Sequence, residues 1–181
     1  SAKIKYHDFE TIKNAANILW FDNHNRSIIF HIIGPDLKFI MGDMPPNVYY
    51  WGAEDYQRVP NWLSAMDIGL YVTKGGYSTY GSPLKVFDYL ASALPVVSTS
   101  HPAVSALLEE LDQSDLMVPS ADAQTLANVL LRLSSDKEQI KRMGAAGRQI
   151  VIDKYNWRRS VSDTMDAIKE ILKEKCKVPK A

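Results

Sequence analysis

Residues 82–98 read SPLKVFDYLASALPVVS, a helical pattern followed by a turn and an apolar run. Ser82 followed by Pro83 predicts a helix N-cap with proline at the first helical position. A turn containing a second proline then leads into an apolar strand over residues 96–99. Lys85 falls in the first turn of the predicted helix, where an ammonium group opposes the helix dipole. An anion bound at this helix start would account for the lysine.

Short apolar runs alternate with helical patterns along the rest of the chain. Because parallel strands need crossover connections, this alternation predicts an α/β fold with a Rossmann-like parallel sheet flanked by helices. Strands are expected over residues 27–34, 47–52, 68–72, 96–99 and 116–118, and helices over 8–21, 59–66, 83–92, 103–111, 121–133, 137–153 and 157–174. No convincing strand precedes the first helix, so the first strand of the sheet is expected to be short or cut away.

The composition is that of an ordinary globular protein, with 46% hydrophobic and 23% charged residues in a chain of 181. Its 21 basic and 21 acidic residues give a formal charge of zero, which argues against a nucleic-acid partner. Cys176 is the single cysteine, so no disulfide framework or clustered metal site is expected, and a reducing, cytoplasmic setting is predicted. No apolar run has the length of a membrane span.

Open α/β sheets bind ligands beyond the carboxyl ends of their strands, and the segment before Lys85 follows such an end. Gly75 and Gly76, with the small and polar residues 77–81, precede the helix, and a glycine-rich loop at a helix start is a common anion site. Lys85 is therefore expected to hold a phosphate, and Asp88 to accept hydrogen bonds from a ribose. The spacing fits equally well a solvated surface pair of Lys85 and Asp88.

The stretch over residues 82–98 resembles the nucleotide-sugar-binding signature of the retaining GT-B glycosyltransferases of group 1. The C-terminal domains of that family carry the pattern SPLK…EYLA.G.PVV. Further matches flank the stretch in the same order: His7 to Glu10 at the first helix, Gly34 and Pro35 after a strand, Asn47 to Gly52, Tyr56 to Pro60, Asp67 before a strand, and Trp157 at the last helix.

By this resemblance Lys85 is the catalytic residue and binds the β-phosphate of a nucleoside diphosphate, while Asp88 contacts the ribose. Tyr80 stands at the first position of the family's pair of glutamates, and Asp88 is a shortened carboxylate at the second. His7 occupies roughly the position of a phosphate-binding lysine. The expected donor-binding set is Gly81, Ser82, Pro83, Leu84, Lys85, Asp88, Tyr80, Gly34, Gly52 and His7.

The resemblance implies the donor-binding half of a GT-B glycosyltransferase that moves a sugar from a nucleoside-diphosphate sugar, with UDP as the expected nucleotide, to a saccharide or lipid-linked acceptor. Residues 1–156 would form the donor domain, and residues 157–181 a helix that clasps an N-terminal domain outside this chain. Neither a metal nor another cofactor is expected. The chain by itself is expected to bind donor without transferring sugar, and peripheral membrane association of the whole protein stays open.

Two other readings of the function stay open, namely a non-catalytic nucleotide-binding module and a GT-B-type epimerase or phosphorylase. Among the remaining histidines, His31 lies inside an apolar run and is expected to be packed in the core. His101 follows a strand, and the sequence fits a cleft residue and an ordinary loop residue equally well.

Overall fold

A computed structural model of the chain describes residues 7–34, 42–74 and 83–175. Tyr80, Gly81 and Ser82 of the expected donor site lie outside these ranges. The strands are β1 (Phe30–Ile33), β2 (Val48–Gly52), β3 (Gly69–Tyr71), β4 (Val96–Thr99) and β5 (Met117–Val118). The helices are α1 (Phe9–Asn17), α3 (Val59–Ser64), α4 (Leu84–Ala91), α5 (Pro102–Glu110), α6 (Ala123–Ser134), α7 (Lys137–Asp153) and α8 (Trp157–Lys175). Short π or 3-10 turns cover Ile18–Asp22, Tyr56–Arg58 and Ser114–Leu116.

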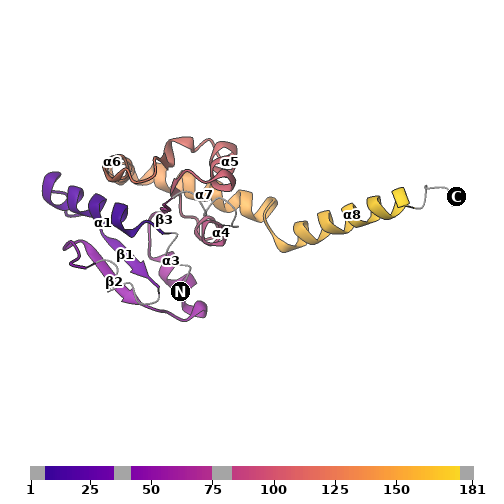
Figure 1. Ribbon diagram of the computed structural model, residues 1–181, viewed down its shortest axis with the longest axis horizontal. Coiled ribbons are helices and arrows are strands. Elements are labelled where there is room, and N and C mark those ends of the chain that lie inside the picture. Colours follow the sequence, from indigo (N-terminus) through magenta and orange to yellow (C-terminus); the bar gives the residue numbers. More distant parts are fainter. Residues whose placement is uncertain (1–6, 35–41, 75–82, 176–181) are drawn as a thin grey trace.

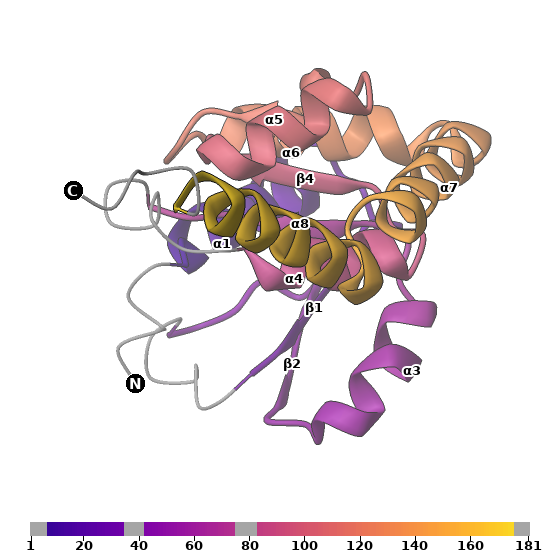
Figure 2. The ribbon, with the colours of Figure 1, turned by 90° about the vertical axis from the view of Figure 1, so that its right-hand side faces the viewer.

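The strands are all parallel and lie among helices, which confirms the predicted α/β class (Figure 1). Their hydrogen bonds form two ladders, one of order β1-β2 and one of order β3-β4-β5. The backbone of residues 7 and 8 bonds to the end of β3, where His7 forms an antiparallel bridge with Thr73 and the Asp8 N–H donates to the Val72 carbonyl at 3.0 Å. In Figure 2, α5 and α6 lie above β4, while β1 and β2 lie below it.

One hydrophobic core joins the two ladders. Phe30 and Val48 of the first ladder are buried in the same cluster as Val96 of the second. Helix α1 packs against α6, and α4 packs against α7. A cap holds the start of α1, because the Asp8 carboxylate accepts hydrogen bonds from the backbone and the hydroxyl of Thr11.

Strand β1 differs from its sequence expectation in length and in burial. It begins at Phe30, because the Asn25 side chain accepts hydrogen bonds from the N–H groups of Ser27 and Ile28 and holds them in a turn. The strand alternates between buried and exposed side chains, so the prediction of a core His31 is wrong. The ring of His31 instead lies on an exposed face beside Tyr49 and Trp51, whose indole N–H donates to His31 Nδ1 at 3.0 Å.

Helix α4 ends in a left-handed turn. Ala93 has φ +59°, its N–H donates to the Leu90 carbonyl, and the Leu94 N–H donates to the Tyr89 carbonyl. These two bonds form a Schellman motif, whose left-handed residue is usually glycine. The signature quoted above has glycine at this position, and the backbone conformation explains that preference.

Glycines let the neighbouring elements approach α4 closely. A Cβ at Gly144 of α7 would overlap the carbonyl oxygen of Ala93, and a Cβ at Gly147 would meet the end of the Leu90 side chain. On the opposite side, a Cβ at Gly69 of β3 would overlap the ring of Tyr89. Because α4 carries Lys85 and Asp88, these contacts fix the position of the expected site.

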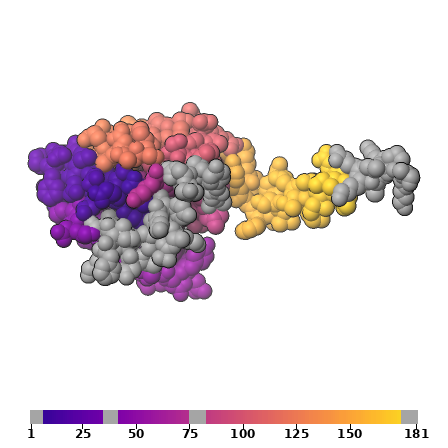
Figure 3. Space-filling model, viewed as in Figure 1, coloured from indigo at the N-terminus to yellow at the C-terminus, as the bar shows by residue number. Residues whose placement is uncertain are grey.

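Helix α8 projects from the rest of the molecule as an arm (Figures 1 and 3). Every side chain described from Trp157 to residue 173 is exposed, and Trp157 is 86% exposed. None of the helices in the described part of the chain combines the length and the apolar character that crossing a bilayer requires.

The Gly144→Ala variant tests the close packing of α7 on α4. In an open helix this change would stabilise the protein by about 0.5–1 kcal/mol. Here we expect a loss of roughly 1–3 kcal/mol, because the new methyl group meets backbone atoms that have little room to move. Gly147→Ala is the matched control, with a smaller loss, since it meets the end of a flexible leucine. Urea unfolding measures both, and a stabilised Gly144→Ala variant would contradict the packing described.

Candidate donor-binding site

The expected phosphate residue lies in the first turn of α4, but the helix begins one residue later than predicted. Leu84 is the first helical residue, and Pro83 occupies the N-cap with φ −80° and ψ 66°. The prediction of Pro83 at the first helical position is therefore wrong, and among the described residues no side-chain hydrogen bond caps the helix. Leu84 is 69% exposed, and its part in holding a phosphate stays a prediction. The N–H groups of a helix start and the helix dipole favour an anion there.

Lys85 meets His7 at this helix start. The Lys85 ammonium donates to His7 Nε2 at 2.9 Å, although the two residues are 78 positions apart in sequence. His7 is held there by its bridge to Thr73 at the end of β3 and by the helix cap at Asp8. The structure thus brings together the two residues that the resemblance assigned to phosphate binding.

The environment of His7 favours its neutral form. Burial of the imidazole lowers the pKa of His7 below 6.5, and the positive charge of Lys85 lowers this pKa further. A neutral imidazole has one nitrogen free to accept, and an ammonium can only donate, which fits the direction of the hydrogen bond. His7 therefore gives Lys85 a neutral hydrogen-bond partner.

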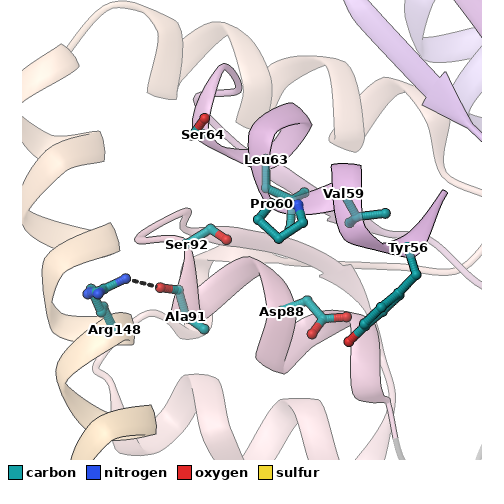
Figure 4. A pocket seen from close by; sticks show the side chains of 9 residues that line it. All are labelled: Tyr56, Val59, Pro60, Leu63, Ser64, Asp88, Ala91, Ser92 and Arg148. Carbon is teal, nitrogen blue, oxygen red and sulfur yellow. Dashed lines mark hydrogen bonds between the residues drawn. The ribbon is translucent and has the colours of Figure 1, made fainter. Parts of the chain in front are cut away.

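Asp88 lies on the next turn of α4 and faces a different neighbour. Its carboxylate points toward Tyr56 at one end of a pocket of about 450 Å³ between α3 and α4 (Figure 4). The pocket is lined by Tyr56, Val59, Pro60, Leu63, Ser64, Asp88, Ala91, Ser92 and Arg148. Partial burial raises the pKa of the Asp88 carboxyl. Among the ion pairs between described residues, none joins Asp88 to Lys85, which disfavours the surface-pair reading.

Gly34 directly follows β1, and Gly52 is the last residue of β2. The Gly34 N–H donates to the Gly52 carbonyl at 2.8 Å, and the Tyr50 hydroxyl donates to the Gly34 carbonyl at 2.9 Å. Gly52 has φ +80°, a backbone conformation that favours glycine. These bonds hold the two glycines to each other within the first ladder. The part of Gly34 and Gly52 in donor binding stays a prediction.

A threonine pair joins the carboxyl ends of β3 and β4, and sequence analysis missed it. The Thr73 N–H donates to Thr99 Oγ1 at 2.8 Å, and the two hydroxyl oxygens lie 3.0 Å apart. Both side chains are buried. The pair could have been predicted from the sequence, because each threonine lies at or just after the end of a predicted strand. The pair fixes the strand end to which His7 is bridged.

The sequence left open whether His101 is a cleft residue or an ordinary loop residue. It occupies the N-cap of α5, just after β4, and is 1% exposed. Its Nδ1 and Nε2 atoms are both buried, and neither has a hydrogen-bond partner among the residues that the structure describes. An unpaired buried polar group costs about 1–3 kcal/mol. The His101 ring lies edge-on to Tyr71 at 5.8 Å, and Tyr71 lies edge-on to His7 at 6.2 Å.

These features define a Rossmann-like domain in which the start of a helix, a position that favours an anion, lies at the carboxyl ends of parallel strands. Comparison with known proteins identifies the family, because the sequence profile described as "Glycosyl transferases group 1" matches residues 5–136. The chain belongs to this family of glycosyl transferases.

Curated relatives of the chain are glycosyltransferases of bacterial polymers and glycolipids. The chain is 31% identical over 117 residues to the amylovoran biosynthesis glycosyltransferase AmsK of Erwinia amylovora, covering 64% of this chain and 28% of that protein. It is 32% identical over 114 residues to the putative teichuronic acid biosynthesis glycosyltransferase TuaH of Bacillus subtilis, covering 55% and 25%. A GDP-mannose-dependent phosphatidylinositol monomannoside mannosyltransferase of Corynebacterium glutamicum is 29% identical over 125 residues, covering 67% and 32%.

Among solved structures, sucrose-phosphate synthase from Thermosynechococcus elongatus shares the fold, with a TM-score of 0.63 and 18% identity. The match covers 90% of this chain and 43% of that one. The chain spans between a quarter and a third of the length of the three curated relatives above. Within the ranges that the structure describes, no three His, Cys, Asp or Glu side chains gather in a way that would hold a metal ion.

The His7 environment predicts a pH dependence of stability. The folded state lowers the pKa of His7 below its unfolded value of 6.5, so the unfolded chain binds more protons as the pH falls. The stability from neutral His7 is complete above pH 6.5 and is lost as the pH falls through the folded pKa. We expect wild type to lose more stability than His7→Gln between about pH 7 and pH 5. Urea unfolding across this range measures the difference, and equal slopes would contradict the assignment.

Proposed function

We propose that this chain is the donor-binding half of a glycosyltransferase that moves a sugar from a nucleoside-diphosphate sugar to a saccharide or lipid-linked acceptor. Membership of the glycosyl transferase family supports the reaction class. The observation that carries the proposal is the placement of Lys85, in the first turn of α4 and 2.9 Å from His7. A cation at a helix start is unfavourable until an anion binds there.

The proposed catalytic role of this site is to stabilise negative charge on the departing diphosphate. When the bond between the sugar and the diphosphate breaks, negative charge grows on the departing diphosphate. The Lys85 ammonium and the free N–H groups at the start of α4 would stabilise that charge as it forms. His7 would release Lys85 to the phosphate and, beside the new anion, would itself bind a proton more readily. In this proposal neither a metal nor a further cofactor takes part.

The pocket beside Asp88 is the proposed place for the nucleoside. Its carboxylate would accept hydrogen bonds from the two ribose hydroxyls, and the apolar side chains of Val59 and Leu63 would pack against the remainder of the nucleoside. We propose UDP as the nucleotide. Because one relative is by its name GDP-mannose-dependent, the guanine nucleotide is the competitor to include in binding tests.

The acceptor and the second half of the active site are proposed to lie in an N-terminal domain. Helix α8 carries an exposed apolar stripe of Val161, Met165, Ile168 and Leu172, which recur every three or four residues. This stripe would pack across such a domain and clasp the two halves. The single cysteine of the chain favours a reducing, cytoplasmic setting for the whole protein.

One sequence feature favours a second candidate function. Tyr80 stands where the family has the glutamate that usually touches the donor sugar, so a non-catalytic nucleotide-binding module is the alternative. Turnover of a nucleotide sugar by the full-length protein separates the two. Release of nucleoside diphosphate that depends on an acceptor supports the transferase, and binding without any turnover supports the module.

The Lys85→Ala variant tests the proposal at its central residue. We expect uridine diphosphate to bind more weakly by roughly 1.5–3 kcal/mol, the range for a hydrogen bond to a charged group. Ligand-free stability should change by less than about 0.5 kcal/mol, because the lysine is exposed and its position opposes the helix dipole. Isothermal titration and thermal melting measure the two effects. Lys141→Ala, at an exposed lysine of α7, is the matched control, and equal affinity of both variants would overturn the assignment.

Helix α8 generates a separate expectation for this chain in isolation. With its apolar stripe exposed, we expect concentration-dependent self-association that Met165→Glu together with Ile168→Glu abolishes. Sedimentation velocity at increasing protein concentration measures it. A strict monomer at high concentration would show that the stripe needs no partner.

A further inference from the structure

We propose that His101 and the start of α5 form a second contact for the diphosphate, on the β4 side of the Lys85 and His7 pair. This inference rests on the proposed donor-binding function, and it assigns a role to a residue that the Lys85 site does not use. In this scheme His101 is a phosphate-binding residue, because its ring would contact the diphosphate that Lys85 neutralises.

The first observation is the state of the His101 side chain. It is 1% exposed, and within the described ranges neither ring nitrogen has a hydrogen-bond partner. A buried position that served only packing would be filled better by an apolar residue, since an apolar side chain leaves no polar atom unpaired. Natural sequences break such local rules mainly at functional sites.

The second observation is the helix that His101 begins. Helix α5 has nine residues and no side-chain hydrogen bond at its N-terminus, where serine, threonine, aspartate or asparagine would usually cap it. The free N–H groups and the dipole of this helix start favour negative charge. An unpaired imidazole and an uncapped helix start therefore occur at the same residue.

The third observation is the location at the carboxyl edge of the strands. Tyr71, at the end of β3, contacts the rings of both His101 and His7 edge-on, and His7 binds Lys85. The buried Thr73 and Thr99 pair ties the ends of β3 and β4 together at this edge. An imidazole N–H donor next to this edge has the right chemistry for a phosphate oxygen, either directly or through one water.

The experiment compares three forms of the full chain, namely wild type, His101→Phe and His101→Gln, with uridine diphosphate as the probe. The phenylalanine keeps a planar ring and removes both nitrogens, while the glutamine restores a donor at similar reach. We expect His101→Phe to weaken binding at least about tenfold, with ligand-free melting unchanged or raised, and His101→Gln to recover part of the affinity. His31→Phe, the same change on the exposed face of β1, is the control and should bind as wild type.

Each outcome decides the inference. If His101→Phe binds uridine diphosphate within about twofold of wild type, or if both His101 variants lose affinity equally, the imidazole serves only the fold and the inference is wrong. If wild type binds no nucleoside diphosphate at all, the proposed function itself fails, and this inference fails with it. Should His101→Phe fail to fold, His101→Leu takes its place under the same criteria.

Discussion

The candidate donor site is built around a positive charge at the N-terminal end of a helix, where the helix dipole disfavours a cation. Lys85 lies in the first turn of α4, where the helix dipole repels a cation, and its ammonium bonds a neutral histidine. We propose that a bound diphosphate supplies negative charge at this end of the helix, where the dipole favours an anion. This one interaction would link the fold to the proposed donor site.

The fold serves this site mainly by fixing α4. Gly144 and Gly147 of α7 and Gly69 of β3 remove the side chains that would keep their elements away from the helix. The left-handed Ala93 then turns the chain from the end of α4 toward β4. On the other side of the site, the cap at Asp8 and the bridge between His7 and Thr73 bring the start of the first helix to the end of β3. Two segments far apart in sequence therefore meet with little freedom.

Much of the fold could be predicted from the sequence, because the order of strands and helices follows from apolar patterns that tertiary contacts reinforce. Helix 137–153 and strand 96–99 have the expected bounds. The burial of single residues was harder to predict. The run around His31 is apolar enough for a strand buried on both faces, yet one face stays exposed, since burial depends on what covers a sheet and not on the strand itself.

The candidate donor site was predictable where a local pattern carries it and unpredictable where distant segments meet. Lys85 and Asp88 follow from a helix start and its next turn, but the residues that they face, His7 and Tyr56, come from other segments of the chain. The position of Pro83 shifted by one residue, because an N-cap and a first helical residue look alike in sequence. His101 gave no signal beyond its place after a strand, since only the packed structure shows that its nitrogens are unpaired.

We propose that Lys85 and His7 together receive a diphosphate, and the pKa of His7 measured by nitrogen NMR would respond to that binding. In the free chain the pKa of His7 should lie below 6.5, because burial and Lys85 both disfavour the imidazolium. With saturating uridine diphosphate we expect this pKa to rise, since the phosphate charge favours the protonated ring. A His7 pKa that is the same with and without the nucleotide would show that no diphosphate binds beside His7.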